Sequence, residues 1–237
     1  MKLSVITPVL NGARFIRKNI ESIMQMKTPH EHIIVDGGST DGTLEVLKEY
    51  PHLIVVNQIE RNGMYGGISL GFKKAQGEFI TWVNCDDWIN PVEYDKMVEA
   101  LTASGADLVY SDSILFFEKE NRIEMSKTCV AAKYFIRHGL LPFVQPASIY
   151  TKNFYESIGG LNTNYRITGD MDMFYRMARV EGAKFIRHKG ASIYFLKYGE
   201  SLGDCNTEKG HREREAAGIP YPKFFHKVMF GFLRRLC

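Results

Sequence analysis

With 237 residues, the chain is long enough to bury a large apolar core without disulfides or structural metals. Apolar residues make up 45% of it and charged residues 24%, which is typical of a folded globular protein and excludes a disordered or collagen-like one. The formal net charge of +3 is too small to indicate a nucleic-acid-binding protein.

The cysteines and the apolar runs bear on the cellular compartment. The four cysteines form no CxxC pair, which argues against a zinc cluster and a disulfide framework, so we expect reduced thiols. The opening residues MKLSVITPVL are typical of a strand and not of a signal peptide, and no apolar run is long enough to span a bilayer. We therefore expect a cytoplasmic protein.

Strands and helices alternate over the first 110 residues. The predicted strands are Lys2–Val9, His32–Val35, Leu53–Asn57 and Phe79–Val83, and the predicted helices are Arg14–Met26, Thr43–Tyr50, Gly66–Ala75 and Pro91–Leu101. This alternation predicts an α/β fold with a Rossmann-like, mainly parallel sheet flanked by helices. In such sheets ligands bind beyond the carboxyl ends of the strands.

The second half is less regular. Residues 107–117 indicate a strand pair, 153–158 a short helix and 171–179 a longer one. Because the chain has no low-complexity linker and no internal repeat, we expect one domain over residues 1–205 and a helical appendage over 206–237.

The appendage ends in a basic amphipathic pattern. Apolar residues recur at near-helical spacing among four basic ones, Lys223, Lys227, Arg234 and Arg235. Such a helix could lie on the anionic inner face of a membrane, pack on its own domain, or bind a partner chain.

Two adjacent carboxylates, Asp86 and Asp87, follow the strand Phe79–Val83. Neighbouring carboxylates repel each other unless a cation or several donors neutralise them, and Mn²⁺ or Mg²⁺ prefers few carboxylates together with phosphate oxygens. The pair therefore predicts a metal–diphosphate site. The alternative is a polar loop that caps the helix beginning at Pro91.

A second acidic turn, VDGGSTDGT, contains Asp36 and Asp41. Its glycines allow a ligand to approach the backbone closely, and Asp36 is suited to accept hydrogen bonds from a base or a ribose. Asp41 is more typical of a turn-stabilising residue. The glycine-rich segment RNGMYGGISLG matches neither GxGxxG nor the phosphate loop, which argues against a dehydrogenase or a nucleoside triphosphatase.

Asp170 stands just before the predicted helix over residues 171–179. It is either the N-cap of that helix or a general base. Asp172 is the reserve candidate for the base, but two positions further along a helix it should face another direction.

These motifs, in this order, resemble the inverting family 2 glycosyltransferases with the A-type fold. The resemblance covers residues 2–200 and is carried by SVITPVLNG, VDGGSTDGT, NGMYGGISLGFKKAQGEFITWVNCDDW, QPASIY, GGLN and GDMDMFYRMA. It implies that Asp170 is the catalytic base and that Asp86 and Asp87 bind the metal. It also implies that a nucleotide-sugar donor contacts Thr7, Pro8, Asn11, Asp36, Asn62, Gly63, Asn84 and Asp86, and that residues 145–148 and 159–160 border the acceptor or sugar pocket.

The chain departs from the family pattern at three places. Asn84 replaces the first acidic residue of the DxD form, and Gly66 and Gly67 replace an acidic and a small residue. The segment 198–202 lacks a histidine that some relatives supply to the metal. The ion would therefore be held mainly by Asp86, Asp87 and the diphosphate.

The function expected from this resemblance is metal-dependent transfer of a hexose or N-acetylhexosamine, with inversion, from a UDP-linked donor. The acceptor would be a hydroxyl of a glycan or of a lipid-linked intermediate in cell-envelope polysaccharide synthesis, such as lipopolysaccharide, at the inner face of the membrane. A sugar nucleotidyltransferase is an alternative, but its basic glycine-rich loop is missing near the N-terminus. A non-catalytic sugar-binding module is the other, and the three carboxylates Asp86, Asp87 and Asp170 argue against it.

Overall fold

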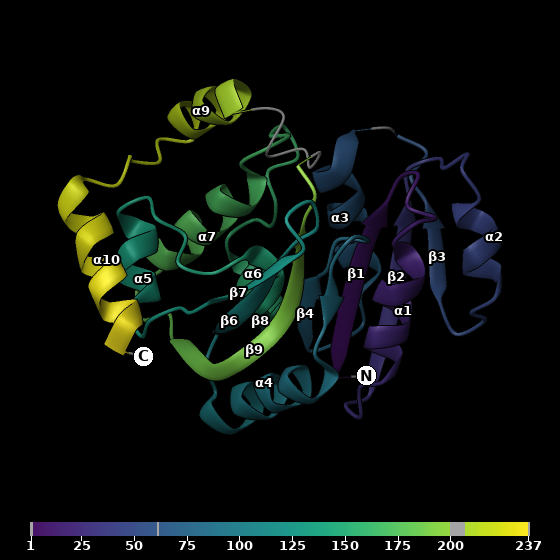
Figure 1. Cartoon of the computed structure of the whole chain (residues 1–237), viewed down its shortest axis with the longest axis horizontal. Helices are drawn as coiled ribbons and strands as arrows, with labels where there is room; N and C mark the ends of the chain where they lie inside the picture. Colours follow the sequence, from purple (N-terminus) through teal and green to yellow (C-terminus); the bar gives the residue numbers. More distant parts are fainter. Residues whose placement is uncertain (1, 61, 200–206, 237) are drawn as a thin grey trace.

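The computed structural model describes residues 2–60, 62–199 and 207–236. In this part of the chain a nine-stranded sheet has the order β3-β2-β1-β4-β8-β6-β9-β5, and β7 pairs with β6 (Figure 1). The strands are β1 (Leu3–Val9), β2 (His30–Asp36), β3 (Ile54–Asn57), β4 (Phe79–Trp82), β5 (Trp88–Ile89), β6 (Leu108–Phe117), β7 (Arg122–Ser126), β8 (Ser148–Thr151) and β9 (Phe185–Lys197).

Helices cover both faces of the sheet. Ile33 and Val35 of β2 share a core cluster with Phe72 of α3, while Ile34, on the other face, clusters with Ile20 of α1. The helices are α1 (Ile16–Met24), α2 (Thr43–Lys48), α3 (Gly63–Lys74), α4 (Pro91–Ser104), α5 (Ala132–Arg137), α6 (Lys152–Ser157), α7 (Gly169–Arg179), α9 (Thr207–Ala216) and α10 (Phe224–Leu236), with a 3₁₀ turn η1 (Gln145–Ala147). None of these helices is both long and apolar enough to cross a membrane.

The first half confirms the predicted alternation and places the site. β1 pairs in parallel with β2 on one side and with β4 on the other, and β2 pairs in parallel with β3. The direction of winding therefore reverses between β1 and β4. Because β1, β2 and β4 are parallel, the loops that follow them lie at the same edge of the sheet. Sheets of this kind bind ligands at this edge, at the point where the winding reverses.

The second half corrects the sequence-based expectation. Residues 107–117 do not form a strand pair: β6 is one ten-residue strand, and its partner β7 follows a turn at Asn121, which has a positive φ of 45°. β8 pairs antiparallel with β4 and β6, whereas β9 pairs in parallel with β6, so the second half mixes both directions. The expected α/β sheet flanked by helices is confirmed, with this mixed second half.

The helices of the expected appendage pack on the domain. Phe230 of α10 packs edge-on against Phe135 of α5, with ring centroids 5.2 Å apart. Figure 1 shows α5 and α10 together at one end of the molecule and α2 and β3 at the other. The expected boundary between residues 205 and 206 lies outside the described residues.

Candidate active site

The loops after β1 and β2 are bonded to each other. The Asn11 amide donates to the Ser39 hydroxyl (2.8 Å), and the Asn11 side-chain oxygen accepts from the Thr40 amide (2.8 Å). Asn11 has a φ of +54°, a conformation that asparagine tolerates better than most residues. Asp41 joins the same network by accepting from the Ala13 amide (3.0 Å) and from Thr43, which is the turn-stabilising geometry expected of it. The edge of the site therefore has a fixed shape.

Asp36 lies at the end of β2, beneath this loop pair. It is only 2% exposed, and its carboxylate accepts hydrogen bonds from the amides of Gly38 (2.8 Å) and Ser39 (3.1 Å). Thr7 and Pro8 are buried in β1, and the Thr7 hydroxyl contacts Nε2 of His32 at 2.9 Å. Of Thr7, Pro8, Asn11 and Asp36, which are all expected to contact the donor, only Asn11 is exposed. The side chain of Thr7 faces the interior.

Asn62 and Gly63 lie where α3 begins. Asn62 is exposed, and Gln58 donates to its side-chain oxygen and to the Gly63 carbonyl (3.0 Å). Gly63 has a φ of +82°, and a Cβ there would lie 1.7 Å from a guanidinium nitrogen of Arg166. The positive φ favours glycine at this position, and the exposed Arg166 side chain lies against it.

Asp86 and Asp87 follow β4 but have different surroundings. Asp87 is 2% exposed, and its Oδ1 accepts from the Leu196 amide of β9 (3.0 Å). Asp86 is half-buried and accepts a hydrogen bond from the Tyr198 hydroxyl. Burial raises the pKa of both carboxyls, and for Asp87 the adjacent charge of Asp86 adds to the rise.

Two buried oxygens beside Asp86 have no hydrogen-bond partner in the described part of the chain: Oδ2 of Asp87 and Oδ1 of Asn84. Leaving buried oxygens without a donor costs free energy, which a divalent cation would offset. Within the described ranges, no three histidine, cysteine or acidic side chains are arranged to hold an ion by themselves. The oxygen donors at Asn84, Asp86 and Asp87 therefore fit a Mn²⁺ or Mg²⁺ whose shell a diphosphate completes.

Asp170 lies in the first turn of α7 and is not its N-cap. The helix begins at Gly169, with Thr168 in the N-cap position. A Cβ on Gly169 would lie 2.7 Å from the Tyr65 ring, so α7 packs closely on α3 at this point. Oδ1 of Asp170 accepts hydrogen bonds from the Tyr65 hydroxyl (3.2 Å) and the Met171 amide (2.7 Å). Burial raises the pKa of this carboxyl, although the hydrogen bonds from Met171 and Tyr65 oppose the rise.

Glu213 of α9 holds the segment that leads into α7. Its carboxylate accepts from the backbone amides of Arg166 (2.8 Å), Ile167 (2.9 Å) and Thr168 (3.0 Å). These hydrogen bonds keep the pKa of Glu213 below its ordinary value although burial opposes them. The sequence analysis missed Glu213 and the contact of Tyr65 with Asp170, because both depend on residues far apart in the chain.

Within the described residues, Asp172 is paired with a basic side chain, unlike Asp170. Arg176 pairs with it at 2.7 Å and also donates to the carbonyls of Ile158 (2.6 Å) and Gly160 (2.7 Å), which fixes the loop expected to border the acceptor pocket. Gln145, at the other expected border, donates to the carbonyl of Trp82 at the end of β4 (3.0 Å).

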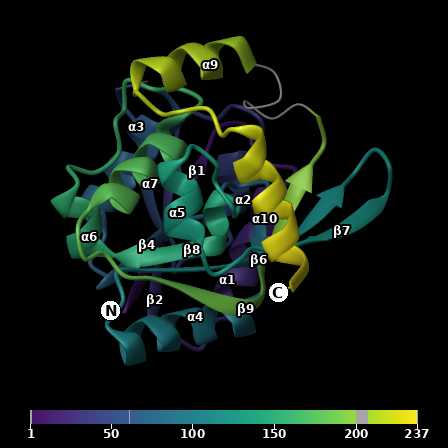
Figure 2. The same cartoon turned by 90° about the vertical axis from the view of Figure 1, so that its left-hand side faces the viewer.

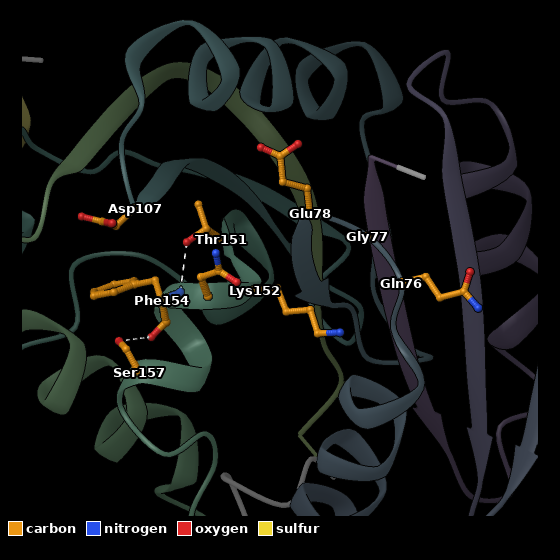
Figure 3. Close-up of a pocket in the computed structure, with 9 residues that line it drawn as sticks. Gln76, Gly77, Glu78, Asp107, Thr151, Lys152, Phe154 and Ser157 are labelled. Atoms are coloured by element: carbon orange, nitrogen blue, oxygen red, sulfur yellow. Dashed lines mark hydrogen bonds between the residues drawn. The ribbon is translucent and has the colours of Figure 1, made fainter.

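A cavity of about 620 Å³ lies at the opposite edge of the sheet (Figure 3). It is lined by residues before β4 and around the junction of β8 with α6, including Glu78, Asp107, Lys152 and Phe154. None of the expected site residues lines it, so this cavity is separate from the candidate active site.

Comparison with known proteins extends this picture. Residues 4–184 match the model of the family described as Glycosyl transferase family 2. An uncharacterized glycosyltransferase of Rickettsia typhi is 25% identical over 198 residues, which cover 77% of this chain and 60% of that protein. The poly(ribitol-phosphate) beta-N-acetylglucosaminyltransferase TarS of Staphylococcus aureus is 36% identical over 97 residues, 38% of this chain and 17% of TarS. The chain thus spans only part of the length of these relatives.

Solved structures share the fold. The crystal structure of TarS 1-349 gives a TM-score of 0.74 at 19% identity, covering 92% of this chain and 65% of that one. Its complex with UDP-GlcNAc gives 0.71 at 20% identity, with coverages of 87% and 61%. The mannosyltransferase PcManGT from Pyrobaculum calidifontis, in complex with GDP-Man and Mn²⁺, gives 0.63 at 18% identity, with coverages of 91% and 61%. Because the family model matches most of its length, this chain belongs to glycosyl transferase family 2.

Proposed function

We propose that this glycosyltransferase moves a hexose or N-acetylhexosamine from a UDP-linked donor to a hydroxyl group, with inversion at the anomeric carbon. The acceptor oxygen forms a bond to the anomeric carbon, and the bond from that carbon to the diphosphate breaks. The acceptor proton goes to a base, and the nucleoside diphosphate leaves. With one base and no second carboxylate as nucleophile, a single displacement inverts the configuration.

The observation that carries the proposal is the environment of Asp170. Oδ1 is occupied by two donors, and no other described residue donates to Oδ2. This leaves one oxygen, in a fixed orientation, to receive a proton from an acceptor. Because burial raises the pKa of the carboxyl, it is a stronger base than an exposed aspartate.

The loop after β4 would bind the leaving diphosphate through a metal ion. Asp86, with Asn84 and Asp87 behind it, would hold Mn²⁺ or Mg²⁺ against the phosphates. When bound, the ion supplies Lewis-acid stabilisation of the charge on the leaving group. The bonded loop pair containing Asn11 and Asp36 would receive the nucleoside without having to become ordered first, which lowers the entropic cost of binding.

The relatives support the choice of donor class. TarS has been solved with UDP and with UDP-GlcNAc, and PcManGT with GDP-Man and Mn²⁺. For the acceptor we propose a glycan or a lipid-linked intermediate of envelope polysaccharide synthesis, reached from the cytoplasmic face of the membrane. The name of TarS, which includes a poly(ribitol-phosphate) acceptor, is compatible with this class.

A donor screen tests the proposal. The purified protein is incubated with UDP-GlcNAc, UDP-glucose, UDP-galactose and GDP-mannose in the presence of Mn²⁺, and thermal stabilisation and nucleoside diphosphate release are measured. We expect a UDP-sugar to raise the melting temperature and to be consumed slowly. Pyrophosphate release from UTP and a sugar 1-phosphate would instead identify a nucleotidyltransferase. Stabilisation by a sugar alone, with no nucleotide requirement, would identify a binding module.

A further inference from the structure

The last described helix, α10, has two different faces. His226 is buried, and Phe230 packs on Phe135 of α5, so this face attaches the helix to the domain. His226 also lies against His138, with ring centroids 4.3 Å apart. In Figure 1 α10 runs along the outer edge of the molecule, and in Figure 2, where that edge faces the viewer, it lies in the foreground beside α5.

The outward face of α10 is apolar. Phe225, Val228, Phe232 and Leu236 are 61%, 53%, 62% and 69% exposed. Their spacings of three, four and four residues place them on one side of an α-helix. Phe224 extends the patch at the start of the helix. Three exposed phenylalanines on one short helix form a contiguous apolar surface, which marks a binding face and not a solvated one.

Positive charge surrounds this face. Lys223, Lys227 and Arg235 are exposed beside it, and the chain contains no aspartate or glutamate from Ala216 to Cys237. A second copy that packed α10 against α10 would bring these cations together with no acid on either helix to offset them. The surface of an anionic bilayer is complementary to both features, because it offers an apolar layer to the phenylalanines and negative charge to the lysine and arginine side chains.

We propose that α10 lies flat on an anionic lipid bilayer and holds the enzyme there. The exposed phenylalanines enter the region between head groups and acyl chains, and the lysine and arginine side chains contact lipid phosphates. The face bearing Phe230 keeps its contact with α5, so the domain remains folded and docked on the helix. This proposal does not depend on the identity of the sugar or of the acceptor.

Vesicle co-sedimentation of the full chain tests it. Vesicles of phosphatidylcholine alone are compared with vesicles of an equimolar mixture of phosphatidylcholine and phosphatidylglycerol. We expect binding to the anionic vesicles only, weakened by added salt. Replacing Lys227 and Arg235 with glutamine should weaken binding about fivefold for each charge removed. The double variant Phe225→Ser/Phe232→Ser should lose most of the binding at low salt as well.

The matched control is Met24→Ser/Val92→Ser, which removes two exposed apolar side chains from α1 and α4. It should bind vesicles like the wild type, and all variants should keep the donor-dependent melting shift, which separates this test from that of the glycosyltransferase activity. Equal loss in the control, or equal binding to vesicles of both compositions, would overturn the proposal. So would a stable dimer in light scattering that dissociates in Phe225→Ser/Phe232→Ser, because the partner of α10 would then be a second copy.

Discussion

The loops after β1 and β2 are fixed by hydrogen bonds between neighbouring turns, whereas Asp170 is held by Tyr65 of α3 and, through the segment before α7, by Glu213 of α9. The hydrogen bonds of Asn11 and Asp41 span at most 29 positions along the chain. Tyr65 reaches Asp170 across 105 positions, and Glu213 reaches Arg166 across 47. The loops expected to bind the donor are therefore a local structure of the parallel half. Asp170, the proposed base, reaches its position only when α3, α7 and α9 have come together.

The largest expected effect is at the base. Asp170→Asn keeps a similar shape but cannot accept the acceptor proton, so turnover should fall about 10²- to 10⁴-fold. Binding of the nucleotide sugar, measured by thermal shift, should change little because the donor side is built separately. Asp172→Asn is the control: its carboxylate pairs with Arg176, so it should lose stability and keep most of the turnover. Equal loss of turnover in both variants would contradict the assignment of Asp170.

The next effect concerns the loop after β4. Asp86→Asn should lower turnover about a hundredfold by weakening stabilisation of the leaving diphosphate. It should also reduce the extra melting shift that Mn²⁺ adds in the presence of UDP, and this shift is measured without any turnover. Asp41→Asn, which alters a turn carboxylate on the same side, should lower stability and leave the Mn²⁺ effect unchanged. An unchanged Mn²⁺ response in Asp86→Asn would exclude this carboxylate as a ligand.

A smaller effect is expected at Glu213. Glu213→Gln weakens several hydrogen bonds to a buried carboxylate, so the free energy of unfolding should fall by about 2 kcal/mol, and turnover should fall as the start of α7 loosens. The folded state depresses the pKa of Glu213 from its ordinary value of 4.5. Above pH 4.5, Glu213→Gln should therefore be less stable than the wild type by the whole amount. This difference should shrink as the pH falls through the lower pKa that Glu213 has in the folded state.

Denaturant titrations over a range of pH values measure this difference. Glu215→Gln, an exposed glutamate on the same helix, is the control and should change stability very little. If Glu213→Gln had no more effect than Glu215→Gln, the contribution of α9 to the seat of Asp170 would be refuted.

The smallest effect is expected at Tyr65. The Tyr65 hydroxyl donates to Asp170 and so favours its ionised form. Tyr65→Phe should raise the pKa of Asp170, which moves the acidic limb of the kcat/KM profile to higher pH. Turnover on the acidic limb should fall about tenfold, since a hydrogen bond to a charged group contributes about 1.5 kcal/mol. Tyr175→Phe, on the helix that carries Asp170, should leave the profile in place. An unshifted profile in Tyr65→Phe would rule out this coupling.

The predicted elements of the parallel half agree with the structure because local pattern determines them. β1 is predicted as Lys2–Val9 and observed as Leu3–Val9, and the helix expected from Pro91 begins there with Asn90 as its N-cap. β1 and β4 are continuous buried, mainly apolar runs, and turn residues follow β1 at Asn11 and Gly12 and β2 at Gly37 and Gly38. Such signals can be recognised in the sequence without knowing which distant residues they contact in the fold.

β9 was not predicted, for a physical reason. Its thirteen residues include Arg187, His188 and Lys189, which interrupt the apolar pattern of a strand. Two of these find partners only in the fold, Arg187 with Asp112 at 3.1 Å and His188 with Glu93 at 2.6 Å. The same limit applies to Glu213, since nothing in HREREAAG shows that one of its glutamates caps a segment near residue 167.

The contact of Glu213 with residues 166–168 sets the smallest unit that can be transplanted. The match to the family model ends at residue 184, and Glu213 lies beyond it. A chimera that took only the matched region from this chain would leave the amides of residues 166–168 without the Glu213 carboxylate, and Asp170, the proposed base, would lose that support. Recombination among these enzymes would therefore have to carry α9 along with the chemistry it supports.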